Sequence, residues 1–253
     1  MGIAVGLNAM RTRLRISWLL VASLCIPLLS RAQSPDSSQL VSVRQLSIPP
    51  KALQAFQKGV ELLAKRDPTG SLPHFQRAIA EFASFYEAYY KMGVANLKLW
   101  RLPDAEQAYR KSIELSGGHY AQPMLALGVL LGYQEKFAEA EGITRKGLDL
   151  DPTSWAGHYS LACALFGLNR LEEAEKSIRE ALRWKIDSAE SQLLLAEIHN
   201  REKDYRAVLD DLDEYLKLDP DSPTSVKARA LRDSAWRSLV ESETATAFIQ
   251  PQP

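Results

Sequence analysis

The chain has 253 residues, of which 46% are hydrophobic and 25% charged, with a formal net charge of +0. These values are ordinary for a folded globular protein of one or two domains. The first 32 residues contain four arginines and no acidic residue, so the remainder carries 27 basic against 31 acidic side chains. A mildly acidic body argues against binding nucleic acid or an anionic membrane surface through bulk charge.

Residues 1–32 have the pattern of a secretory signal peptide. Three arginines between positions 11 and 15 precede an apolar stretch at positions 16–29, which is short for a transmembrane helix. Small residues then favour cleavage after Ala32. Met10 is an alternative start to Met1, and an uncleaved membrane anchor is the alternative to cleavage.

Cysteine content agrees with export but does not require it. Cys25 lies in the predicted signal, so Cys163 is the only cysteine of a cleaved chain and no intramolecular disulfide can form. We expect Cys163 to be a small buried residue rather than a reactive thiol.

A periodic set of small residues organises the chain after this segment. Its members are Gly59, Gly93, Gly128, Ala162 and Ala196, which are almost evenly spaced along the sequence. Three later positions recur in phase with this set, and one of them is occupied by Phe75, Tyr109, Thr144, Ile178 and Leu212. A period of about 34 residues indicates a helical-repeat array.

The pattern resembles the tetratricopeptide repeat, whose units pair two helices with small residues where the helices cross. The resemblance covers five units, 52–85, 86–119, 121–154, 155–188 and 189–222. It implies an all-α fold, a right-handed α–α superhelix of stacked helix hairpins. Asp67-Pro68-Thr69-Gly70 departs from the family pattern, and we expect an unusual turn there.

The apolar pattern is consistent with this architecture. Each unit has two apolar stripes at helical spacing, and one hairpin cannot bury both, so hairpins must stack. A glycine inside a helix costs about 1 kcal/mol relative to alanine. We therefore expect close helix contact at the three glycines of the periodic set.

The two ends of the array are predicted separately. Residues 33–51 are expected to be a flexible tether, and 244–253 a disordered tail. Residues 223–243 are predicted to form a capping helix that covers the last unit. Its expected inner face is Val226, Ala230, Leu231, Ala235 and Leu239.

Signatures of catalysis or metal binding are missing from the sequence. It contains no phosphate loop, zinc-protease motif or nucleophile elbow. The histidines lie in different repeats with no carboxylate at ligand spacing, and the acidic pairs Glu172-Glu173 and Asp210-Asp211 are expected on solvated faces. We therefore expect no enzyme activity, cofactor or metal, with an unrecognised enzyme as the residual alternative.

The resemblance implies a concave groove lined by the first helix of each unit. Helical phase selects the side chains that point toward it. The predicted peptide- or protein-binding residues are Phe56, Tyr90, Leu97, Lys98, Tyr133, Tyr159, Phe166, Asn200 and Arg201. Packing against neighbouring first helices is the alternative role for such residues.

The sequence thus predicts an exported scaffold, periplasmic or secreted in a bacterium, that holds a peptide or a helix of another protein in this groove. The alternative is an inner-membrane-anchored assembly subunit of an envelope complex that retains its signal. The partner, the pathway and the oligomeric state stay open.

Overall fold

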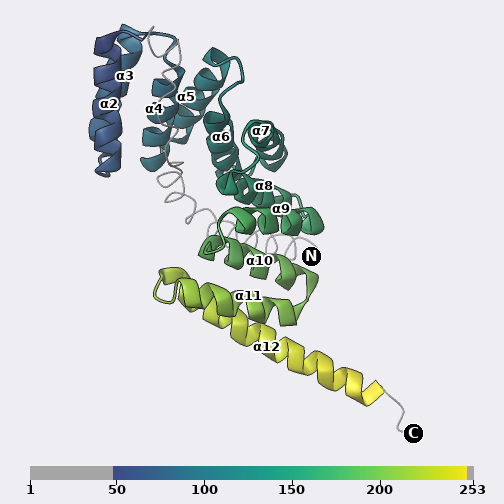
Figure 1. Ribbon diagram of the computed structural model, residues 1–253. Helices are drawn as coiled ribbons and strands as arrows, with labels where there is room; N and C mark the ends of the chain where they lie inside the picture. Colours follow the sequence, from purple (N-terminus) through teal and green to yellow (C-terminus); the bar gives the residue numbers. More distant parts are fainter. Residues whose placement is uncertain (1–47, 250–253) are drawn as a thin grey trace, which may run out of the picture. The chain divides into compact units, whose positions relative to one another are not determined.

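The computed structural model describes residues 48–249, which form α-helices joined by turns (Figure 1). This confirms the predicted all-α fold class. The described residues divide into two compact units, 48–160 and 161–249, with the boundary inside helix α8 (Trp155–Gly167). The predicted signal peptide and all but the last residues of the predicted tether lie outside the described residues.

The unit 48–160 contains three helix hairpins. Their first helices are α2 (Pro50–Ala64), α4 (Tyr86–Lys98) and α6 (Ala121–Tyr133). Their second helices are α3 (Pro68–Glu81), α5 (Leu102–Leu115) and α7 (Phe137–Leu150). Each second helix packs on the first helix of its own hairpin, and α3 and α5 also pack on the first helix of the next. Stacking of this kind buries both apolar stripes.

The unit 161–249 continues the pattern. It contains α9 (Leu171–Trp184), α10 (Ala189–Glu202), α11 (Tyr205–Leu218) and the long α12 (Pro223–Ile249). In this unit α9 packs on α10, α10 on α11, and α11 on α12.

The turn inside each hairpin has one conformation throughout. Five non-glycine residues adopt a left-handed backbone with φ between 56° and 63°, namely Arg66, Trp100, Glu135, Asn169 and Lys203. Each follows a small residue of the periodic set at the same spacing. The next amide donates to a carbonyl near the end of the first helix, as Asp67 N does to Leu62 O at 2.9 Å and Asp204 N to His199 O at 3.0 Å.

The unusual turn expected at Asp67 is therefore not found. The first hairpin turns as the other four do, because Asp67 caps α3 by accepting from Gly70 N at 2.8 Å. Pro68 stands at the first helical position, where its missing amide proton costs nothing.

The helices of a hairpin meet closely at the periodic small residues. A β-carbon built on Gly59 would lie 2.6 Å from the Phe75 ring, and one on Gly93 would lie 2.6 Å from the Tyr109 ring. Both rings are fully buried. The expected close contact is present, and it explains why glycine is tolerated in the middle of these helices.

The N-terminal end of the array differs slightly from the prediction. The first helix begins at Pro50 rather than at residue 52, since proline is well tolerated in a first helical turn. Ile48, predicted to belong to the tether, is buried against Ala52, Ala55 and Phe85. The last part of the tether thus packs on the first hairpin.

At the other end, α12 follows the prediction in part. It buries Ala228 and Ala235, but two residues predicted to face inward are exposed, namely Ala230 and Val226, the latter by 68%. Ser225 is buried instead of Val226, and its hydroxyl donates to Asp219 O. Because successive helical residues are about 100° apart, burying Ser225 turns Val226 outward. The helix also continues to Ile249, beyond its predicted end at 243, because no proline or glycine intervenes. Within residues 48–249, no helix is both long and apolar enough to span a membrane.

Gly93→Ala is expected to lower the free energy of unfolding by about 1–2 kcal/mol, because the new methyl group overpacks the Tyr109 ring. Gly142, on α7, faces open space. Gly142→Ala is therefore expected to raise the free energy of unfolding by about 0.5–1 kcal/mol through helix propensity alone. Urea unfolding followed by circular dichroism measures both. Effects of the same sign would contradict the close-contact explanation.

Candidate functional site

The nine predicted groove residues divide by accessibility. Leu97, Tyr90, Tyr159 and Phe166 are buried, the last two with only 1% and 2% of their surface exposed. The other five are partly exposed: Phe56, Lys98, Tyr133, Asn200 and Arg201. The buried members offer almost no surface to a ligand in this structure.

Tyr90 is buried by aromatic packing between two hairpins. Its ring centroid lies 6.1 Å from that of Tyr109 and 5.5 Å, edge-on, from that of Tyr120. Tyr120 is the single residue inserted between the second and third repeats. Burial raises the pKa of Tyr90 to about 12, as expected for a phenol away from water.

The first helices of the unit 48–160 keep exposed apolar surface at two places. On α2, Phe56 is half-buried, with its ring centroid 4.9 Å from that of Phe85. At the turn ends of α4 and α6, the Trp100 and Tyr133 rings meet edge-on at 5.3 Å, and Trp100 is 54% exposed. Partly exposed aromatic rings are common anchors for protein partners.

A positive region lies near the second of these places. Lys98, at the end of α4, is half-buried, and both burial and the charge of Arg66 lower its pKa. A partly desolvated ammonium gains from a carboxylate partner. We call Lys98, Trp100, Tyr133 and Arg66 the turn-end patch.

Sequence reasoning missed Trp100 and Arg66. Both occupy the left-handed position of their hairpin turn, at the same spacing from the periodic glycine. Their place in the repeat was visible in the sequence, but their exposure depends on the turn conformation.

In the unit 161–249, Arg201 has a structural role. Its guanidinium lies 3.6 Å from the centroid of the Phe166 ring, and its Nη1 donates to Phe166 O at 3.0 Å. It therefore covers the ring and satisfies a carbonyl at the end of α8, a favourable place for a cation. Burial lowers the pKa of Arg201.

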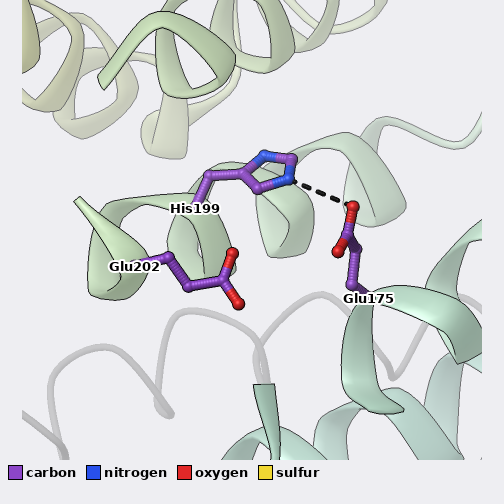
Figure 2. Close-up of side chains that lie close together, drawn as sticks. All are labelled: Glu175, His199 and Glu202. Carbon is purple, nitrogen blue, oxygen red and sulfur yellow. Dashed lines mark hydrogen bonds and ion pairs between the residues drawn. The ribbon is translucent and has the colours of Figure 1, made fainter. Parts of the chain in front are cut away.

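The expectation that no histidine has a carboxylate partner is wrong for His199 on α10. His199 Nδ1 lies 2.6 Å from Asp211 Oδ2 on α11, and Nε2 lies 3.4 Å from Glu175 Oε1 on α9 (Figure 2 shows the second contact). The hydrogen bond with Asp211 raises the pKa of His199. Asp211 is accordingly half-buried rather than on a solvated face. Sequence spacing missed these partners because they come from neighbouring helices rather than from the same helical turn.

His158 and Cys163 do not share the environment of His199. His158 Nε2 lies 2.9 Å from Pro152 O, so it bonds locally. Cys163 is buried, as expected of a small packing residue.

Stacked helix hairpins with a recurring turn and no strand among residues 48–249 define a helical-repeat protein. The sequence pattern of the tetratricopeptide repeat matches residues 56–119, 125–190 and 159–223. The chain belongs to the tetratricopeptide-repeat family, a scaffold fold typical of protein–protein interaction.

Solved structures share the fold at low sequence identity. MamA from Desulfovibrio magneticus RS-1, residues 41 to the end, superposes with a TM-score of 0.61 at 17% identity, covering 70% of this chain and 99% of that one. YrrB, described as a TPR protein with an unusual peptide-binding site, gives a TM-score of 0.57 at 15% identity, covering 74% and 95%.

One curated relative matches in part. The human protein O-mannosyl-transferase TMTC1 is 26% identical over 119 residues, 47% of this chain. This chain spans only 13% of the length of that protein.

Arg201→Lys is expected to lower the free energy of unfolding by about 1–2 kcal/mol, because lysine loses the stacking on Phe166 and the planar hydrogen-bonding geometry. Arg206→Lys is the matched control, since Arg206 is exposed and pairs with Glu243 at 2.9 Å. It should change the free energy of unfolding by less than about 0.5 kcal/mol. Thermal unfolding in parallel measures both, and equal losses would contradict a structural role for Arg201.

Proposed function

We propose that this chain is an exported scaffold that binds a peptide or an amphipathic helix along the first helices of the unit 48–160. The observation that carries the proposal is the combination of exposed and partly exposed aromatic and cationic side chains at the turn-end patch, with Phe56 partly exposed on α2.

The chemistry of the patch selects a kind of ligand. Trp100 and Tyr133 offer apolar faces, and Lys98 with Arg66 offers two positive charges. A segment that carries an apolar or aromatic residue near an aspartate or glutamate complements both features. That YrrB is described as having a peptide-binding site supports the choice of a peptide over a small molecule.

Not all of the predicted groove residues would contact the ligand. Tyr90, Leu97 and Tyr159 would support the surface rather than touch the ligand, because they are buried, and Phe166, which is also buried, belongs to the unit 161–249. Asn200 is partly exposed on α10, and Arg201 beside it already binds Phe166. We therefore propose the primary contacts at Phe56, Lys98 and Tyr133. We propose no catalytic role. Mannosyl transfer is named only for TMTC1, and this chain spans 13% of the length of that protein.

Selection of random displayed peptides against the whole chain tests this proposal. The expected binders combine apolar and acidic residues and lose affinity at least tenfold for a Lys98→Glu, Tyr133→Ala double variant, which removes the charge and the ring together. Fluorescence anisotropy of a selected peptide measures the loss.

The matched control is a Lys111→Glu, Tyr89→Ala double variant. Lys111 and Tyr89 line a separate hollow between α3, α4 and α5. The two substitutions therefore make the same chemical changes at a different place. Binding lost by the control and kept by the first variant would move the site to that hollow and contradict the proposal.

Export and processing form a second part of the proposal, supported by the arginine-rich, apolar start of the sequence. We expect the protein recovered from the cell envelope to begin at Gln33, after removal of residues 1–32. N-terminal sequencing of the purified native protein measures this. A chain that still carries the apolar segment 16–29 would favour the alternative, an anchored assembly subunit.

A further inference from the structure

His199 lies among carboxylates from three helices. Asp211 of α11 contacts Nδ1 of its ring, and Glu175 of α9 faces Nε2. Glu202 stands three residues after His199 on α10, and so on the same side of the helix. One ligand atom from each of Glu175, His199 and Glu202 lies within 4.8 Å of the others (Figure 2).

Asp211 fixes which ring nitrogen is available. An ionised carboxylate 2.6 Å from Nδ1 accepts a proton from that nitrogen, so the lone pair of a neutral ring is on Nε2. Nε2 is directed toward Glu175, with a contact of 3.4 Å that is long for a hydrogen bond. A carboxylate behind a histidine in this way is the usual support of a metal-binding imidazole.

Burial holds the ring in place while leaving access from one side. The His199 residue is 7% exposed, so its ring has little freedom to turn away. Glu175 is half-buried, whereas Glu202 is exposed and can move toward the ring. An ion would therefore reach Nε2 from the side of Glu202.

The local charge is unbalanced when the imidazole is neutral. Among the described residues, three carboxylates face one cation, Arg179, which donates to Oε1 of Glu175 from Nε at 3.0 Å and from Nη2 at 2.5 Å. Both of these bonds use Oε1, which is also the Glu175 oxygen that faces Nε2 of His199. A divalent cation would neutralise the excess negative charge.

We propose that Glu175, His199 and Glu202 form a binding site for a divalent transition-metal ion, zinc in particular, with Asp211 as the residue that positions the imidazole. One imidazole nitrogen with two carboxylates suits zinc, whereas magnesium and calcium prefer oxygen ligands alone. A tetrahedral zinc site holds its ligand atoms roughly 3.3 Å apart, so Glu202 must close toward the ring, with water as the fourth ligand. The ion would join α9 to α10.

Calorimetric titration of the chelator-treated whole chain with zinc chloride tests the site. We expect one saturable site that Glu202→Gln weakens at least tenfold, because this change removes one charged ligand and leaves the His199–Asp211 pair intact. Glu214→Gln is the matched control, since Glu214 is on α11 and pairs locally with Lys217, at 2.9 Å. It should leave zinc affinity within twofold.

Asp211→Asn tests the positioning role. We expect zinc affinity to fall 10- to 100-fold, as is usual when the group behind a metal-binding histidine is changed. Nitrogen chemical shifts of the His199 ring should show the proton leaving Nδ1, which a general loss of stability would not produce.

Two results would overturn the proposal. One is no saturable zinc binding up to about 1 mM, a very weak affinity by protein standards. The other is equal binding by the Glu202→Gln variant. In either case the cluster is an ion-pair network in which a protonated His199 joins Glu175 to Asp211.

Discussion

The close approach of the two helices in each hairpin is the constraint on which the rest of the structure depends. At Gly59 and Gly93 the space of a β-carbon is occupied by an aromatic ring from the second helix of the hairpin. The helices can only cross at that point, so one small residue and one large residue set the geometry of the hairpin. Within each unit, the repetition of this contact lets one hairpin stack on the next and bury both of its apolar stripes.

This constraint determines which side chains are left for a partner. Phe75 and Tyr109 fill the crossings, and Tyr90 is buried between Tyr109 and Tyr120. Aromatic content along the first helices is therefore largely structural. Exposed aromatic and cationic groups remain where the chain turns, because the left-handed residue of each turn projects away from the packed helices, as Trp100 does.

The recurring small residues were sufficient to predict the fold and the close helix contacts. Phase along a helix was less informative about the site, because it gives the face of a side chain and not its depth: Tyr133 and Tyr159 were both predicted to face the groove, yet only the first is partly exposed. The partners of His199 were hidden because contacts between neighbouring helices follow from packing rather than from short sequence spacing. On α12, the hydrogen bond of Ser225 overrode the apolar pattern that placed Val226 inside.

The central functional claim is that a partner lies against the turn-end patch of the unit 48–160. A photoreactive amino acid introduced at position 98 in the living cell, compared with the same amino acid at position 111, tests it most directly. Both positions carry a lysine in the native chain, and Lys111 lines the separate hollow between α3, α4 and α5. We predict a discrete cross-linked partner from position 98 and none from position 111. Cross-linking from position 111 alone would contradict the claim.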